Sequence, residues 1–273
     1  MTKVLNKTGE RLIPESFTSK EEYLMYLRHI FAYSYAASHI SKNDLVLEVG
    51  SGEGYGTNIL STKVKSIVGL DVDLEAIEHA NKKYKSKKCE FIHYTGKKLP
   101  FPDNKFDKVV SFQVIEHVTD DKEYLNEIYR VLKNKGDFIV STPNRNHRLE
   151  PNQKPWNRFH LREYSPEGLS ELLSKKFNNV EVWGIFGVDE AQDIEINRIK
   201  KVRRMISLDP LGVRHILPET IKLKAAKLAR ILSRGRSTTE NNASYMQKYG
   251  IDSYTLNKSD NSKSLDLFAH CKK

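Results

Sequence analysis

Cysteine and long apolar runs are both scarce in this chain of 273 residues. The two cysteines, Cys89 and Cys271, lie far apart and belong to no CxxC or Cys/His cluster, which excludes a disulfide framework and a zinc finger. No stretch reaches the roughly 18 apolar residues that a membrane span requires. The first residues, MTKVLNKTGERLIPES, lack the apolar core of a signal peptide. We therefore expect a cytoplasmic protein with two reduced thiols.

Aromatic and acidic residues are rare in one segment, residues 198–236. It holds twelve Lys or Arg, two acidic residues and no Phe, Tyr or Trp. Its net charge of +10 equals that of the whole chain, so the remaining residues are balanced. An anionic membrane, a phosphorylated substrate or nucleic acid would each explain such a concentration, and so would a solvated helical face without a partner. Nucleic acid is less favoured, because single-strand binders stack bases on aromatic side chains.

Short runs rich in β-forming residues alternate with stretches of helical period from Leu45 onward. The helical stretches are 75–84, 123–133 and 166–177, each with apolar residues at i, i+3, i+4 and i+7. The candidate strands are 45–49, 66–71, 89–94, 108–113, 138–142, 180–186 and 264–271. Such alternation predicts a doubly wound, mostly parallel α/β sheet, here of seven strands.

Two regions lie outside this alternation. Residues 20–40 form an aromatic-rich helix that could cover the top of the sheet as a lid. Residues 188–250 separate the last two strands and contain two amphipathic basic helices, 197–208 and 219–235. We divide the chain into four parts: an N-terminal helical lid (1–40), a core (41–187), a basic helical insertion (188–250) and a C-terminal strand (251–273) that completes the core.

The stretch 45–60, LVLEVGSGEGYGTNIL, is a strand followed by glycines. Gly50, Gly52 and Gly54 permit a tight turn and let backbone N–H groups approach a nucleotide-like ligand. The dinucleotide fingerprint GxGxxG would need glycine at Tyr55, so the spacing excludes a typical NAD site. A structural turn without a ligand is the alternative.

Asp71 ends the second strand, nineteen residues after Gly52. A carboxylate at this edge can accept hydrogen bonds from both hydroxyls of a ribose. Val72 offers an apolar surface for a purine. Asp73 precedes the helix that starts near Leu74, so we predict that Asp73 is the helix cap and that Asp71 binds the ribose.

Several blocks in a fixed order carry a family resemblance: LVLEVGSGEG, IVGLDVD, LPFPDNKFDKVVSFQVIEHV and YLNEIYRVLKNKGDFIVSTPN. Together they resemble a class I S-adenosylmethionine-dependent methyltransferase over residues 45–144. The resemblance implies a seven-stranded Rossmann-like methyltransferase sheet and S-adenosylmethionine as cofactor. It also implies roles for single residues. Glu48 and the three glycines flank the methionine moiety, Asp71 holds the ribose, and the carbonyls of Phe112 and Gln113 face the methionine amine.

The adenine end departs from the family pattern. Relatives often carry an acidic residue near Thr95 that bonds the adenine amino group, and here Thr95, Gly96 and Lys97 stand there. We therefore expect the segment around Thr95 and Gly96 to hold adenine mainly through its backbone.

The flanking segments TGERLIPESF, LRHIFAYSYAA, STPNR and FHLREYSPEGLSELL are similar to those of methyltransferases from glycan and polysaccharide biosynthesis. This resemblance implies O-methylation of a sugar or glycan-related acceptor, including lipid- or nucleotide-linked sugars. Three alternatives stay open. One is an RNA methyltransferase whose basic insertion binds phosphates, another is a methyltransferase of a small molecule such as a lipid or quinone precursor, and the third is a cofactor-binding protein without activity.

An alcohol acceptor must lose a proton as it is methylated, and a neutral imidazole can take that proton near neutral pH. His117 follows the fourth strand, and His160 lies on the long connection after the fifth strand, so both can reach the carboxyl edge of the sheet where α/β proteins place ligands. Each also has a structural alternative, as part of a helix start or a loop. Arg28 could reach the cofactor carboxylate, or it could pair with acids at the surface.

A catalytic metal is not indicated by sequence spacing. Glu78 and His79 belong to a helix away from the carboxyl edge, with no HxxxH or paired-carboxylate pattern beside them. We therefore predict no metal.

Overall fold

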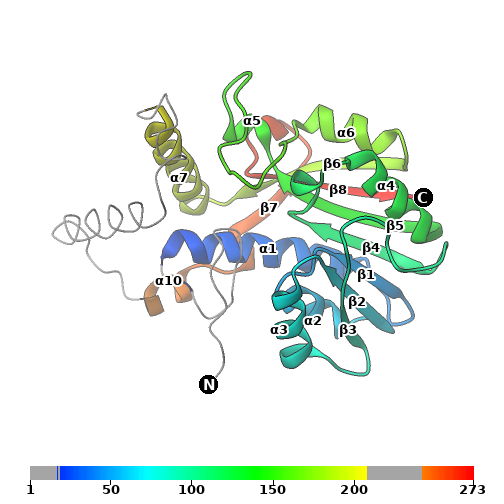
Figure 1. The fold of residues 1–273 in the computed structure, drawn as a ribbon. Coiled ribbons are helices and arrows are strands. Elements are labelled where there is room, and N and C mark those ends of the chain that lie inside the picture. Colours follow the sequence, from blue (N-terminus) through cyan, green and yellow to red (C-terminus); the bar gives the residue numbers. More distant parts are fainter. Residues whose placement is uncertain (1–16, 18, 208–241) are drawn as a thin grey trace.

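The computed structural model describes residue 17 and residues 19–207 and 242–273. Eight strands form one sheet in the order β3-β2-β1-β4-β5-β8-β6-β7 (Figure 1). Strands β1 to β5 pair in parallel, whereas β8 runs antiparallel between β5 and β6. The strands are β1 (Leu45–Val49), β2 (Ser66–Asp71), β3 (Cys89–His93), β4 (Phe106–Phe112), β5 (Leu132–Pro143), β6 (Asn178–Gly187), β7 (Tyr254–Asn257) and β8 (Asp266–Lys272).

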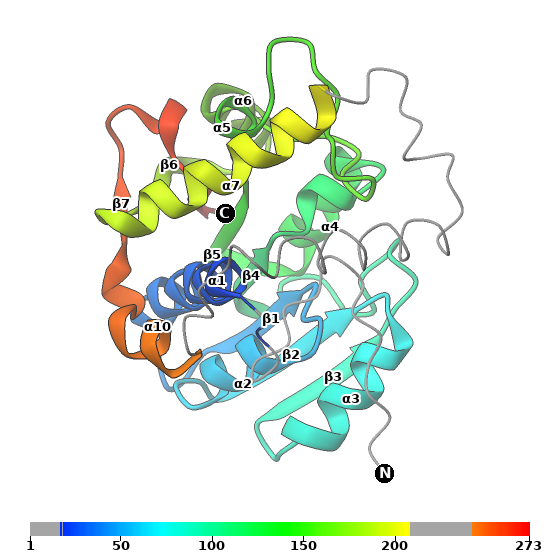
Figure 2. The ribbon, with the colours of Figure 1, turned by 90° about the vertical axis from the view of Figure 1, so that its left-hand side faces the viewer.

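Helices cover both faces of the sheet, each over its own apolar core (Figure 1). Buried side chains of α1, α2 and α3 pack on one face, and those of α4 and α6 pack on the other. In Figure 2, α1 is seen nearly end-on with α7 and α10 beside it. The helices are α1 (Lys20–Ser38), α2 (Tyr55–Ser61), α3 (Leu74–Tyr84), α4 (Asp121–Val131), α5 (Arg145–Arg148), α6 (Pro166–Ser174), α7 (Glu190–Ser207) and α10 (Asn242–Lys248). Three single turns of 3₁₀-helix are η1 (Ile115–His117), η2 (Ile251–Ser253) and η3 (Asn261–Lys263).

The predicted doubly wound α/β fold is confirmed, but the prediction of seven strands is wrong. The eighth strand, β7, is four residues long and pairs antiparallel with β6 at the edge of the sheet. A run as short as YTLN carries too little alternation to be distinguished from a loop. The other seven strands lie where the sequence predicts them, with β4, β5 and β6 longer than expected.

The predicted N-terminal helix is α1, which begins after Ser19, whose side chain accepts a hydrogen bond from the N–H of Glu22 at 3.2 Å. Leu24, Ala32 and Ala36 of α1 are buried against the sheet. The helix is therefore a packed layer over one face of the sheet, and its role as a lid stays a prediction.

The basic insertion is described only in part. Helix α7 begins at Glu190, seven residues before the predicted start, while the second predicted helix, 219–235, lies outside the described residues. Among the helices that the structure describes, none is long and apolar enough to cross a membrane. The division of the chain into four parts stays a prediction.

Candidate active site

The glycine loop after β1 is held against the end of β2. The N–H groups of Gly50 and Ser51 both donate to the carbonyl of Leu70, at 2.7 and 2.8 Å. Gly50, Gly52 and Gly54 all have positive φ, between 50° and 83°, which L side chains rarely adopt. A Cβ on Gly50 would overlap Val114, whereas a Cβ on Gly52 would meet no atom within 4 Å. Gly52 therefore faces open space, where the backbone can approach a ligand.

Asp71 is oriented by the same loop. One carboxylate oxygen accepts the N–H of Gly52 at 2.8 Å, and the other accepts the N–H of Asp73 at 2.9 Å. Asp73 caps α3 by accepting the N–H of Ala76, as predicted. A carboxylate can accept about four hydrogen bonds, so Asp71 can bond the backbone and a ribose together.

Val72 and Gly96 lie side by side next to Asp71. The Val72 side chain is 57 % exposed, and a Cβ on Gly96 would lie 3.2 Å from it. Gly96 has φ +77°, and Thr95 beside it is exposed. The residues that the sequence predicts for adenine thus form one surface, with an apolar side at Val72.

Arg130 fixes the loop that follows this surface, a role that the sequence did not reveal. Its guanidinium donates to the carbonyls of Leu99 and Phe101, at 3.0 and 2.7 Å, and to the carboxylate of Glu127. Glu127 in turn accepts the N–H of Leu99. These contacts join α4 to the segment next to Gly96.

Glu48 is fully buried at the end of β1. Its two carboxylate oxygens accept hydrogen bonds from the hydroxyls of Tyr33 on α1 and Thr57 on α2. Burial is the largest cause that raises the pKa of Glu48, to about 7. Tyr33 also packs on Gly56, where an added Cβ would lie within 2 Å of the ring. Glu48 therefore connects three elements beneath the glycine loop.

The end of β4 turns sharply at Gln113. Gln113 has φ +57°, and its N–H donates to the carbonyl of Ser141 at 2.9 Å. Phe112 before it is buried and packs edge-on against Tyr33. Strained backbone of this kind often occurs at functional sites, and here it follows directly on the strand next to β1.

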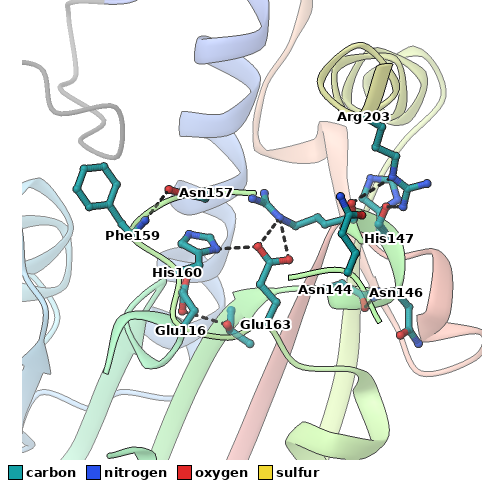
Figure 3. Close-up of polar contacts among 12 residues, drawn as sticks. Glu116, Asn144, Asn146, His147, Asn157, Phe159, His160, Glu163 and Arg203 are labelled. Carbon is teal, nitrogen blue, oxygen red and sulfur yellow. Dashed lines mark hydrogen bonds and ion pairs between the residues drawn. The ribbon is translucent and has the colours of Figure 1, made fainter. Parts of the chain in front are cut away.

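His117 and His160 meet beyond this turn, although they come from separate connections. Their ring centroids lie 4.8 Å apart. The Nδ1–H of His117 donates to the carbonyl of Phe159 at 3.0 Å. The Nδ1–H of His160 donates to the carboxylate of Glu163 at 2.7 Å (Figure 3). Because each acceptor is an oxygen that carries no proton, the neutral rings have their lone pair on Nε2. Both histidines thus lie beyond the carboxyl end of β4, and their catalytic roles stay predictions.

Glu116 lies beneath the two imidazoles with its side chain fully buried. One oxygen accepts the hydroxyl of Thr142 at 3.0 Å, while the other, Oε1, has no hydrogen-bond partner and lies 4.0 Å from Nε2 of His117. Burial raises the pKa of Glu116 to about 8. The carbonyl of Glu116 accepts the N–H of Leu161, which holds the His160 connection in place.

Glu163 and Arg148 support His160 through its Nδ1. The Nε of Arg148 donates to both oxygens of Glu163, at 3.1 and 3.2 Å, and both side chains are buried. Figure 3 shows the hydrogen bond that joins Glu163 to His160. The sequence did not reveal these two residues or Glu116, because their roles depend on contacts between separate loops.

Glu116, His117 and His160 form a group whose ligand atoms lie within 4.8 Å of one another, so it could hold a metal ion. The prediction of no metal came from sequence spacing alone, and the fold supplies a ligand group that spacing could not show.

Comparison with known proteins agrees with this geometry. Residues 47–140 match the family model described as a methyltransferase domain. A probable S-adenosylmethionine-dependent methyltransferase from Mycolicibacterium smegmatis is 38 % identical over 180 residues, which is 66 % of this chain and 68 % of the relative. A protein of Mycobacterium tuberculosis with the same description is 36 % identical over 193 residues, 70 % of this chain and 68 % of the relative. The chain belongs to the S-adenosylmethionine-dependent methyltransferases. It is an enzyme, so a binding protein without activity is no longer an alternative.

Solved structures of methyltransferases share this fold. One from Thermotoga maritima superposes with a TM-score of 0.55 and 19 % sequence identity, over 93 % of this chain and 94 % of that one. At this identity the likeness concerns the fold alone. The methyltransferase family implies S-adenosylmethionine as cofactor, and the open space at Gly52 beside an oriented Asp71 fits a nucleoside with a charged tail.

Arg28 does not fit its predicted place on the cofactor carboxylate. Its side chain is 5 % exposed, and its guanidinium lies 2.7 Å from the carboxylate of Asp266 and 3.0 Å from that of Glu195. Two buried carboxylates therefore hold this methyltransferase's Arg28 between β8 and α7. The alternative interpretation, pairing with acids at the surface, is right about the acidic partners and wrong about the surface, because both carboxylates are buried.

Proposed function

We propose that this enzyme methylates a hydroxyl group of a sugar or glycan-related acceptor. The observation that carries the proposal is the meeting of His117 and His160 beside the glycine loop. Val114, three residues before His117, contacts Gly50, so the imidazoles adjoin the region assigned to the methionine end of the cofactor. The site lies where the connections after β1 and β4 leave adjacent strands, which is where α/β sheets bind ligands.

We assign the cofactor to residues at the carboxyl ends of β1, β2, β3 and β4. Gly50, Gly52 and Gly54 lie along its methionine end, with Glu48 beneath them as a positioning residue. Asp71 binds the ribose hydroxyls. The adenine rests between Val72 and the backbone of Thr95 and Gly96, and the carbonyls of Phe112 and Gln113 face the methionine amine.

The cofactor supplies an electrophilic methyl group on a sulfonium. The protein aligns the acceptor hydroxyl with that group and keeps water away, since alignment supplies much of the rate of such displacements. His160 takes the hydroxyl proton on Nε2 as the new O–C bond forms. Its Nδ1–H is held by Glu163, and this carboxylate stabilises the imidazolium that results. His117 is the second candidate for the base.

A base at this position favours an alcohol over a carboxylic acid as acceptor. A carboxyl group is already ionised near neutral pH and needs no proton removed, whereas an alcohol does. The proposal that the acceptor is a sugar or glycan rests on the resemblance of the flanking segments to methyltransferases of glycan and polysaccharide biosynthesis. A lipid or quinone precursor with a hydroxyl group is the nearest alternative.

The basic segment 198–236 would hold the anionic part of the acceptor or an anionic membrane. In the described part of that segment, Lys200, Lys201 and Arg204 of α7 are exposed. RNA binding is less favoured, because no aromatic residue accompanies these charges.

Two measurements test the proposal. Thermal stability with S-adenosylhomocysteine should rise with ligand concentration as mass action requires, and an unchanged melting temperature would contradict cofactor binding. Radiolabelled methyl transfer should then be screened over sugar nucleotides, lipid-linked sugars, quinone precursors, carboxylic acids and RNA. Labelling of RNA alone, or of carboxylic acids alone, would contradict the proposal that the acceptor is a sugar hydroxyl.

A further inference from the structure

We propose that Glu116, His117 and His160 bind one divalent transition-metal cation. The inference deepens the proposed function, because such a cation would hold the acceptor hydroxyl at the same site. The three residues come from η1 and from the connection that crosses it, and Leu161 ties the two together through the carbonyl of Glu116. The ligand group is therefore built by the fold.

The two imidazoles are oriented as ligands usually are. A histidine that binds metal typically donates its other ring N–H to a carbonyl or carboxylate, which fixes the ring and the tautomer. His117 donates Nδ1–H to the carbonyl of Phe159, and His160 donates Nδ1–H to the carboxylate of Glu163. Both types of partner are present, and Arg148 holds Glu163 in turn.

Glu116 gives the independent observation. Its side chain is fully buried, yet Oε1 makes no hydrogen bond and points toward Nε2 of His117 at 4.0 Å. Buried carboxylate oxygens without a partner are rare, because losing water without a replacement is costly. Thr142 satisfies only the other oxygen. A cation would satisfy Oε1 and balance its charge.

The distances suit a site that closes slightly around the ion. Nitrogen and oxygen ligands lie about 2.1 Å from such a cation, so two ligand atoms on it are roughly 3 to 4.2 Å apart. The ligand atoms here lie within 4.8 Å of one another, which small side-chain rotations can correct. Two imidazoles and one carboxylate favour zinc, manganese, iron or cobalt over magnesium or calcium, which prefer oxygen. Three protein ligands also leave coordination positions for an acceptor.

The cation would assist transfer as a Lewis acid. A hydroxyl bound to it has a lowered pKa and releases its proton to water, as metal-bound water does. The resulting alkoxide oxygen forms a bond to the methyl carbon while the carbon–sulfur bond breaks, and that electron pair stays on sulfur. In the metal-bound enzyme His160 is a ligand of the cation. The cation then activates the acceptor hydroxyl in place of the His160 imidazole.

The test is titration of the full-length protein, freed of metal with a chelator, with Co²⁺ in the absence of cofactor. We expect one equivalent to bind, with visible absorption bands of Co²⁺ in a protein site. Glu116→Gln, His117→Gln and His160→Gln should each weaken binding about 10- to 100-fold. His79→Gln on α3 is the matched control and should bind as the wild type does. Circular dichroism identifies any variant that fails to fold, and Glu116→Gln retains an acceptor for Thr142.

The proposal is overturned if the folded wild type shows no saturable Co²⁺ or Zn²⁺ binding, or if His117→Gln and His160→Gln both bind as tightly as the wild type. The outcome is separate from that of the proposed function. Metal binding without methyl transfer to any hydroxyl would contradict only the function, and methyl transfer that is unaffected by chelator, in a protein that binds no metal, would contradict only the site.

Discussion

At the scale of single residues, Asp71 is the polar side chain that the sequence located best. Its carboxylate is fixed by two backbone N–H groups from the glycine loop and the start of α3, so its orientation does not depend on the ligand. Preorganisation of this kind lowers the entropy cost of binding.

Asp71→Asn should therefore weaken S-adenosylhomocysteine binding about 10- to 100-fold, since hydrogen bonds to a charged group contribute about 1.5 to 3 kcal/mol. Isothermal titration calorimetry measures this directly. Asp73→Asn is the control, because Asn caps a helix as well as Asp does and should leave the affinity within about twofold. Equal affinities for the two variants would show that Asp71 does not bind the ribose.

Glu48 makes stability depend on pH. Burial raises its pKa to about 7 in the folded enzyme from an ordinary value of 4.5, so the folded state binds more protons than the unfolded state between these pH values. Its contribution to stability is then complete below about pH 4.5 and decreases as pH rises through 7. Glu48→Gln should remove this slope, by about 1 to 3 kcal/mol between pH 5 and 8. Urea unfolding of the wild type and of Glu48→Gln at pH 5 and pH 8 tests this prediction. If the free energy of unfolding changes equally with pH in both proteins, the prediction is contradicted.

Local conformations and positions that depend on local pattern were predictable, and contacts with distant partners were not. The glycines, Asp71 and the cap at Asp73 follow from spacing and turn chemistry. Glu116 and Glu163 required the fold, because their partners come from other connections. Arg28 was misassigned for the same reason: the carboxylates that hold it belong to α7 and β8.

At the scale of elements, the core strands and amphipathic helices follow the hydrophobic pattern closely. The edge strand β7 was missed, and the helix expected directly after the glycine loop, α2, was predicted without bounds. The sequence of α2, YGTNILS, has too few apolar residues to show a helical period, and it is stabilised by packing of Tyr33 on Gly56. Tertiary contact thus decides the elements that pattern leaves undefined.

Helix α7 provides a test of membrane binding by the basic segment. Lys200→Glu with Lys201→Glu reverses two exposed charges, and each lysine near an anionic bilayer contributes about 1 kcal/mol. Partitioning onto phosphatidylserine vesicles should therefore fall about 30-fold or more in a sedimentation assay. Lys82→Glu with Lys83→Glu on α3 makes the same change of charge elsewhere and should partition as the wild type does. If both double variants partition alike, α7 is not the membrane contact.

At the scale of the whole molecule, the order of strands explains why the site lies where it does. Strands β1 and β4 are neighbours, so the glycine loop and the turn at Gln113 leave the same edge of the sheet together. Helix α1 packs across one face of the sheet, where its buried side chains belong to the apolar core. The sequence blocks in their fixed order predicted that the connections after β1 and β4 lie together. The region proposed to bind the acceptor is built by long connections, and the sequence predicted only its two histidines.

The rate of methyl transfer to a hydroxyl acceptor, compared between the wild type and His160→Ala, tests the central claim most directly. We expect radiolabel from S-adenosylmethionine to appear on the acceptor oxygen, and the variant to turn over about 10²- to 10⁴-fold more slowly while its affinity for S-adenosylhomocysteine is preserved. Wild-type turnover by the His160→Ala variant would contradict the account.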